Sequence, residues 1–471
     1  MNLIKNFTYL LFSDSVSKIA NFAVMAYLAR ILLPDGVGLI NWIQSIVMLV
    51  ALIPNFGLNE YGILSISSNR SIKNIEDTVG RILGFRIVIG VATYLGLIVC
   101  VLTIPQLKEF SVFFIIGGLL LFATIFSFDW FYTSIENQYL IGFVRIFSKL
   151  FYLVSTFLFV HSKDDILFAL ILLVLNELIF SVALLFLYYS RLKFSIKIVF
   201  RNFHSLFLPA LPMALYTSSS LIIYSADIVV LGMLISMHDL GLYSSAVKII
   251  ALFIALKYLV GQIIYPKIVN QFSNSPQNLN LLLNLINKYS ILGSLVLTIC
   301  LAASAQTLTL LILGKAYAES APVFILMIPA LFCEFCWIAF PYLVISSNKT
   351  AYSIMIVSTG IIKIVTIPLA YYLGGLLGCA VAYSLMNIIL FSCCIFYIHF
   401  KVVRLDIFQV LCYPLLISSS LILLFIIPPY ENGLLVLAIG ATLLVFYMLS
   451  SDIKRFKWDT LKKDLAFINA S

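Results

Sequence analysis

Long apolar runs alternate with short polar breaks along the whole chain. Most runs reach the twenty or so predominantly apolar residues that a helix needs to cross a lipid bilayer, and their order predicts about fourteen membrane-spanning helices. The predicted spans are residues 7–29, 37–55, 79–104, 111–134, 139–161, 165–188, 205–235, 242–265, 283–312, 321–346, 350–372, 376–398, 407–428 and 433–450. The pattern therefore predicts an all-α polytopic membrane protein.

The composition leaves no room for a large water-soluble domain. Hydrophobic residues make up 62% of the 471 residues and charged residues 10%, whereas soluble domains are about 25% charged. The cysteines lie in apolar runs, where cysteine behaves as a small hydrophobe, and we interpret the Cys333-x-x-Cys336 pair as packing. The four histidines are scattered near segment ends. We therefore expect no metal site and no organic cofactor.

The basic residues predict the orientation in the membrane. One set of alternate breaks, together with both ends of the chain, holds Lys5, Arg70, Lys73, Arg81, Arg191, Lys193, Lys197, Arg201, Lys267, Lys349, Lys401, Arg404 and the tail lysines and arginine of 454–463. The other set holds little more than Arg30, Lys108, Lys163 and Lys315. Because cytoplasmic loops carry the excess of Lys and Arg, both termini are predicted to be cytoplasmic. Anionic lipid head groups, and not nucleic acid, then account for the net charge of +9.

A faint internal repeat predicts the domain organisation. Gly38 follows the first predicted helix and Gly241 follows the seventh, 203 residues later, in similar short motifs. Two further pairs recur at similar offsets, Phe128-Asp129-Trp130 with Phe335-Cys336-Trp337 and Asn137 with Asn348. An even number of helices per repeat predicts lobes related by an axis along the membrane normal, as in transporters. The predicted division is a six-helix lobe over 1–200, a second over 201–402, and two extra helices with a basic tail over 403–471.

Basic residues inside the predicted spans are the strongest functional signal. Each costs about 2.5 to 3.5 kcal/mol at the bilayer centre, so each must face a cavity, pair with an acid or extend to the surface. Lys18 can pair with Asp14 four residues earlier, and Arg30, Arg145 and Lys257 can extend to head groups, while the deeper positions favour a cavity. The candidate anion-binding residues are Lys18, Arg30, Arg86, Arg145, Lys149, Lys248, Lys257 and Lys363.

Two acids and two prolines are further candidates. Asp227 on the seventh helix, and after it Glu177, could bind a coupling proton or sodium ion, although a pair with a nearby cation explains them equally well. Pro209 and Pro212 remove backbone donors near the start of the seventh helix. They predict a bend, which could be a moving gate or a static kink.

Three segments resemble a known family. Residues 29–38 (ARILLPDGVG) resemble the A-R-x-L-x-P-x-x-x-G end of the first helix in polysaccharide flippases, which belong to the multidrug, oligosaccharidyl-lipid and polysaccharide exporter superfamily. Residues 55–62 and 239–249 are similar to the second-loop segment and the eighth-helix entry of that family. The chain departs from the family pattern at Leu33, where glycine is common, and before Glu136, where the usual glycine is absent.

The resemblance implies a function. It implies a flippase, not an enzyme, that moves an undecaprenyl-pyrophosphate-linked O-antigen repeat unit from the cytoplasmic to the periplasmic leaflet of the bacterial inner membrane by alternating access around a cationic central cavity. It also implies an O-antigen polymerase and a chain-length regulator as partners. The basic surplus agrees with this cargo, because guanidinium and ammonium groups bind pyrophosphate oxygens.

Two other functions agree less well with the sequence. A drug or cation antiporter of the same superfamily would favour an acidic cavity, whereas the intramembrane surplus here is basic. An O-antigen polymerase or other membrane glycosyltransferase would carry a large extracytoplasmic loop with catalytic polar residues, and the predicted outward loops are short. The sequence therefore favours the flippase.

Overall fold

A computed structural model describes residues 3–192, 197–200, 203–274, 276–405 and 410. Throughout these residues the regular structure is helical, and no strand is present among them. The chain divides into two compact units, Met1–Gly241 and Leu242–Ser471. We call them the N-terminal and the C-terminal unit, and each is described by itself. The predicted all-α fold is confirmed.

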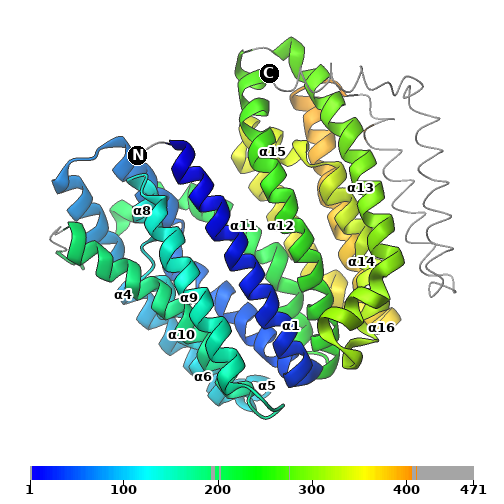
Figure 1. Ribbon diagram of the computed structural model, residues 1–471. Coiled ribbons are helices and arrows are strands. Elements are labelled where there is room, and N and C mark those ends of the chain that lie inside the picture. The colour runs from blue at the N-terminus through cyan, green and yellow to red at the C-terminus, as the bar shows by residue number, and fades with distance from the viewer. Residues whose placement is uncertain (1–2, 193–196, 201–202, 275, 406–409, 411–471) are drawn as a thin grey trace. The chain divides into compact units, whose positions relative to one another are not determined.

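The elements follow in chain order and are labelled in Figure 1. The N-terminal unit contains α1 (Leu3–Val50), α2 (Leu52–Asn55), α3 (Leu58–Ser68), α4 (Ile72–Thr103), α5 (Pro105–Lys108), α6 (Ser111–Gly118), α7 (Leu120–Ile125), α8 (Asp129–Ser134), α9 (Gln138–Phe159), α10 (Ile166–Leu187), a π-helical turn (Tyr188–Leu192) and α11 (His204–Gly232). The chain then continues through α12 (Met237–Asn274), α13 (Pro276–Leu313), a 3₁₀ turn (Lys315–Tyr317), α14 (Ser320–Cys336), α15 (Ala339–Ser347) and α16 (Lys349–Lys401).

Two helices are each long enough for two crossings. The 48 residues of α1 and the 53 residues of α16, at 1.5 Å per residue, far exceed the roughly 30 Å hydrocarbon core. Each is kinked inside, α1 at Leu33 before Pro34 and α16 at Gly374 and Gly375. The kinks fall between predicted spans, namely 7–29 and 37–55 in α1 and 350–372 and 376–398 in α16.

The predicted spans within the described residues all fall on helices. By length and apolar composition, the described residues contain eight helices able to cross a membrane, or nine if α14 and α15, bent by 56°, form one span. The spans predicted at 407–428 and 433–450 lie outside the described residues. The count of fourteen stays a prediction, as does the division into six-helix lobes.

Leu33 adopts a backbone conformation that favours glycine. Its φ of 60° and ψ of 177° lie in a region that side chains with a Cβ rarely enter, at a cost of about 1–3 kcal/mol. This is the position at which the sequence departs from the glycine common in the family it resembles. The kink of α1 is therefore made with the less suitable residue, next to a proline that restricts it further.

We expect Leu33→Gly to stabilise the protein. Relief of the strain outweighs the greater chain entropy that glycine loses on folding, about 0.5–1 kcal/mol, so the expected gain is about 1 kcal/mol. Thermal unfolding of the purified protein in detergent measures it. Ile31→Gly, a helical neighbour two residues away, is the control and should lower the unfolding temperature. An unfolding temperature for Leu33→Gly at or below that of the parent would contradict the expectation.

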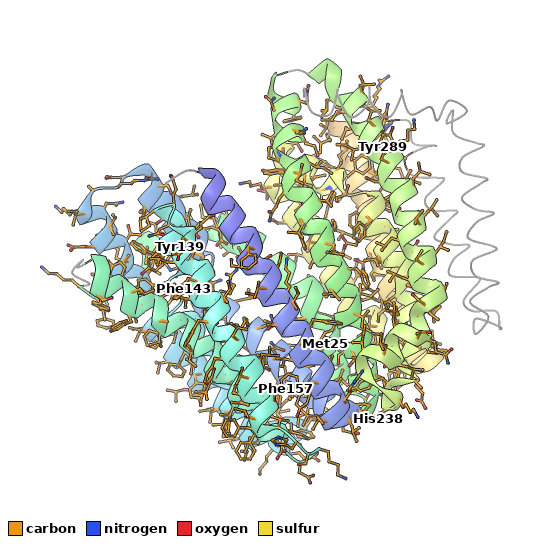
Figure 2. The ribbon with its side chains drawn as sticks, viewed as in Figure 1. Met25, Tyr139, Phe143, Phe157, His238 and Tyr289 are labelled. Atoms are coloured by element: carbon orange, nitrogen blue, oxygen red, sulfur yellow. The ribbon has the colours of Figure 1, made fainter. Side chains whose placement is uncertain are left out.

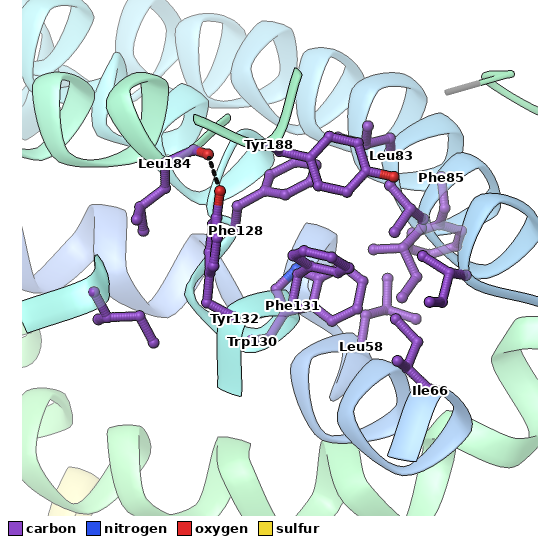
Figure 3. Packing of buried hydrophobic residues seen from close by; sticks show 14 of the residues in the cluster. Leu58, Ile66, Leu83, Phe85, Phe128, Trp130, Phe131, Tyr132, Leu184 and Tyr188 are labelled. Atoms are coloured by element: carbon purple, nitrogen blue, oxygen red, sulfur yellow. Dashed lines mark hydrogen bonds between the residues drawn. The ribbon is translucent and has the colours of Figure 1, made fainter. Parts of the chain in front are cut away.

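One hydrophobic core cluster of the N-terminal unit surrounds the break between α7 and α8 (Figure 3). Phe128, Phe131 and Tyr188 are fully buried there, and the ring centres of Phe131 and Tyr188 lie 4.8 Å apart. Tyr132 donates a hydrogen bond to the Leu184 carbonyl oxygen at 3.0 Å. The aromatic anchor of the predicted repeat in this unit is therefore a packing element.

Gly38 and Gly241, the first matching pair of the predicted repeat, lie where two backbone segments touch. A Cβ added at Gly38 would overlap the carbonyl oxygen of Met237, and one added at Gly241 would overlap that of Pro34. Met237 follows Pro34 by the same 203 residues that separate the two glycines, so the contact is reciprocal. His238 and Asp35, a third pair at this offset, approach to 3.2 Å. Glycine is required at both positions because the two backbones touch.

Candidate substrate-binding site

Two predicted cations share one carboxylate between α1 and α9. Lys18 Nζ lies 2.6 Å from Asp14 Oδ2, and Arg145 Nη1 lies 3.9 Å from Asp14 Oδ1. Each of the three side chains is about one-third exposed, at 36%, 32% and 31% for Lys18, Asp14 and Arg145. We call these residues the Asp14 cluster. It carries one net positive charge and is accessible from outside the packed interior of the unit.

The geometry of α1 and α9 explains the cluster. The two helices run side by side in the N-terminal unit, and Figure 2 labels Tyr139, Phe143 and Phe157 along α9. Arg145 also lies 5.5 Å from the ring centre of Phe180 on α10, within the range of a cation–π contact. The guanidinium therefore lies near both the Asp14 carboxylate and the Phe180 ring.

Lys149 pairs with a separate acid one turn along α9. Its Nζ lies 2.9 Å from Glu177 Oε1, which also accepts a hydrogen bond from Asn176 at 2.7 Å. Lys149 thus has a carboxylate separate from that of Asp14, which Lys18 and Arg145 share. The two acids reduce the repulsion between Arg145 and Lys149, which lie four residues apart on one helix face. Glu177, a candidate for ion coupling, is therefore the partner of a candidate anion-binding lysine.

Arg86 is enclosed within the N-terminal unit. Its side chain donates to the Oδ1 atoms of Asn55 at 2.8 Å and Asn59 at 2.6 Å and to the Ser127 carbonyl oxygen at 3.3 Å, and the residue is 1% exposed. It thereby connects α2, α3 and the segment between α7 and α8. Among the described residues, its Nε and the Glu60 Oε2 atom are buried without a hydrogen-bond partner. A direct contact with substrate would require some of these bonds to be exchanged.

Two candidate cations of the C-terminal unit are buried. Lys257 forms an ion pair with Glu334 in which both side chains are at most 7% exposed, and its Nζ lies 5.2 Å from the Phe391 ring centre. It does not extend to the surface. Lys363 is 1% exposed and its Nζ lies 4.3 Å from the ring centre of Tyr383.

The remaining candidates occupy different environments. Arg30 is exposed near the kink of α1, and Lys248 is half-buried on α12. Asp227 is fully buried on α11, where its Oδ1 accepts the Ile228 amide at 3.0 Å. Pro209 and Pro212 lie inside α11, which continues helically through both. Whether they act as a gate stays a prediction.

The structure thus brings together only part of the predicted set. Lys18 and Arg145 meet at Asp14, with Lys149 on the same helix as Arg145, whereas a single cationic cavity stays a prediction. The sequence analysis did not predict Asn55 and Asn59 as partners of Arg86. Their position as polar residues in the apolar segment 55–62, which resembles the family, could have indicated such a role. Within the described residues no three His, Cys, Asp or Glu side chains gather as metal ligands.

The helices and their apolar surfaces define a multi-pass membrane protein. A family model described as polysaccharide biosynthesis protein matches residues 3–271, more than half of the chain, and the chain belongs to this family. The resemblance identified from the sequence is thereby confirmed at the level of the family. No curated protein sequence matches the chain.

One of the similar solved structures has the same fold over nearly its whole length. The lipid II flippase MurJ in an inward closed conformation is similar with a TM-score of 0.69 and 14% identity, over 95% of this chain and 99% of that chain. The Vibrio cholerae MATE transporter VcmN in its bent form reaches a TM-score of 0.43 with 13% identity, over 88% and 96% of the two chains. The likeness to the MurJ structure extends over nearly the whole chain and agrees with a polytopic all-helical fold.

Proposed function

We propose that this protein is a flippase for an undecaprenyl-pyrophosphate-linked oligosaccharide, an O-antigen repeat unit, which it moves outward across the bacterial inner membrane. The observation that carries the proposal is the Asp14 cluster, in which two accessible cations share one acid inside an apolar chain. Membership of a polysaccharide biosynthesis family and a fold shared with a structure named as a lipid II flippase support it.

The Asp14 cluster has the chemistry to bind a pyrophosphate. An ammonium has three hydrogen-bond donors and a guanidinium five. The 3.9 Å between Arg145 and Asp14 is longer than a hydrogen bond, so the guanidinium donors are not committed to that carboxylate. Asp14 therefore orients Lys18 and Arg145 while leaving donors for phosphate oxygens, which Arg binds bidentately.

Lys149 offers a link between cargo and a coupling ion. It lies on α9 one turn beyond Arg145, paired with Glu177 at 2.9 Å. A pyrophosphate that draws Lys149 away would leave the Glu177 carboxylate to bind a proton or a sodium ion. We propose coupling at Glu177 on this ground, with Asp227 as a second candidate site.

Transport of a labelled cargo tests the proposal. The purified protein is reconstituted into vesicles with a fluorescent polyprenyl-pyrophosphate oligosaccharide, and loss of the inner-leaflet label is followed. We expect flipping of this cargo but not of the same oligosaccharide on an uncharged polyprenol, because the cation site has then no anion to bind. Exchange of organic cations against protons without movement of the lipid would instead identify an antiporter. A flippase-null bacterium scored for surface glycan provides the cellular test.

The membrane potential should drive part of the transport. An anionic head group gains about 2.3 kcal/mol per charge and 100 mV when it moves outward from an inside-negative compartment. We therefore expect faster outward flipping under an inside-negative potassium-diffusion potential than under the opposite sign. Equal rates under both signs would contradict this.

Imposed ion gradients separate the contribution of ion coupling from that of the membrane potential. Glu177→Gln should keep the response to potential and lose any response to an imposed proton or sodium gradient, and Asp227→Asn is the matched comparison. If both variants respond to the gradients as the parent does, coupling at these acids is wrong.

A further inference from the structure

A groove in the C-terminal unit lies outside the site described above. It has a volume of about 320 Å³ and runs between α12, α13 and the break between α14 and α15. Figure 2 labels Tyr289, one of its lining residues, on α13. Its apolar lining includes Val260, Ile263 and Ile264 from α12, Ile286 from α13, and Phe335 and Ile338 beside the break.

Local geometry keeps the groove open. The helix axis changes direction by 56° from α14 to α15. The two helices therefore do not form one straight helix along the groove. On α13, a Cβ added at Gly293 would meet no atom within 4 Å. On the other side, Tyr342 of α15 packs so closely on Gly261 of α12 that a Cβ there would overlap its ring. The groove is therefore bounded by packed helices of this unit.

Positive charge lies at one end of this apolar lining. Lys267 is the last groove residue along α12, and only residue 275 separates that helix from α13, so the end of α12 and the start of α13 lie at the same end. A hydrocarbon surface ending in lysine is complementary to a lipid with an anionic head group.

We propose that this groove binds one hydrocarbon chain of an anionic glycerophospholipid, with the lipid phosphate at Lys267. The volume is at the lower end of the range for ligand sites, about 300 to 1,000 Å³, which suits a single chain. The hydrocarbon chain contacts Phe335 near the end of α14 and Ile338 in the α14–α15 break. Glu334 of the buried ion pair is the residue before Phe335. The bound lipid supports this bend, whatever cargo the protein carries.

Photolabelling tests the proposal. The full chain is placed in phosphatidylcholine vesicles with phosphatidylglycerol that carries a photoactivatable acyl chain, and the adducts are mapped by mass spectrometry. We expect adducts concentrated on residues 260–267 and 282–294. Lys267→Gln should lower the preference for phosphatidylglycerol over an equally labelled phosphatidylcholine about fivefold. Lys108→Gln, outside the groove, should leave it unchanged.

A second experiment fills the groove with a larger side chain. Gly293→Trp, or Gly293→Leu if the larger variant is not recovered, should abolish these adducts. Gly96→Trp on α4 is the matched control, since a Cβ there also meets no atom within 4 Å. The proposal is overturned by uniform labelling of all apolar helices, by equal labelling with both phospholipids, or by a Gly293→Trp result equal to that of Gly96→Trp. It is also overturned if a labelled polyprenyl phosphate is bound in preference.

Discussion

Removal of the Asp14 cluster is expected to reduce flipping of the pyrophosphate-linked cargo by a hundredfold or more. A hydrogen bond to a charged group contributes about 1.5–3 kcal/mol, and each 1.4 kcal/mol is tenfold, so Lys18 and Arg145 should each contribute about ten- to a hundredfold. Asp14→Asn/Lys18→Gln/Arg145→Gln is the appropriate variant, because it neutralises the acid together with both cations. No unpaired charge then remains to disturb insertion or folding.

The chain offers a matched control. Arg81 and Asp77 also form an ion pair four residues apart on one helix, with side chains 36% and 44% exposed, similar to the Asp14 cluster. Asp77→Asn/Arg81→Gln should therefore flip cargo at the parental rate. Arg145→Lys should be intermediate, because lysine keeps the charge and loses the bidentate geometry. Initial flipping rates in vesicles measure all three. A triple variant as active as the Asp77/Arg81 control would remove the cluster from the proposed mechanism.

Breaking the Lys257–Glu334 pair is expected to prevent stable folding. Both side chains are almost completely buried, and removal of one partner leaves an uncompensated buried charge at a cost of about 3–5 kcal/mol. That is a large part of the roughly 5–15 kcal/mol that stabilises a typical protein. Glu334→Gln should therefore give little monodisperse protein on size-exclusion chromatography and a strongly lowered unfolding temperature.

A double variant distinguishes a structural role of Lys257 from a role in transport. Lys257→Met/Glu334→Leu removes both charges, and apolar replacement of a buried pair is often neutral or stabilising, so the unfolding temperature should return to near the parental value. If this variant also flips cargo normally, Lys257 is structural and leaves the list of candidate anion-binding residues. If it folds but does not transport, Lys257 has a role in transport. Parental stability of Glu334→Gln would contradict the buried-pair argument itself.

The helices could be predicted from the sequence because the bilayer removes the competing structures. Inside lipid, each backbone N–H and C=O must be satisfied within the segment, so an apolar run of about twenty residues becomes a helix whatever it packs against. The continuity of α1 and α16 through their kinks was not predicted, because a kink and a short loop leave similar signals in the sequence.

The partners of the charges could not be predicted in the same way. The pair of Asp14 and Lys18 follows from helical spacing, but Arg145 reaches Asp14 from 131 residues further along the chain and Glu334 reaches Lys257 across 77. Lys257 was a candidate for the membrane surface, and the structure places it in the interior of its unit. Spacing along one helix shows which residues share a face, whereas the opposite helix and its register depend on packing.

The sequence by itself determined the membrane location, the helical architecture, the basic surplus and the family likeness, since each follows from composition or from patterns within single segments. Only the tertiary structure decided how the cations are used. Arg86 connects helices, Lys257 neutralises a buried acid, and Lys18 with Arg145 shares one carboxylate at an accessible position. The physical reason is that the cost of a charge in lipid is a property of the residue, whereas the way that cost is offset is a property of its neighbours.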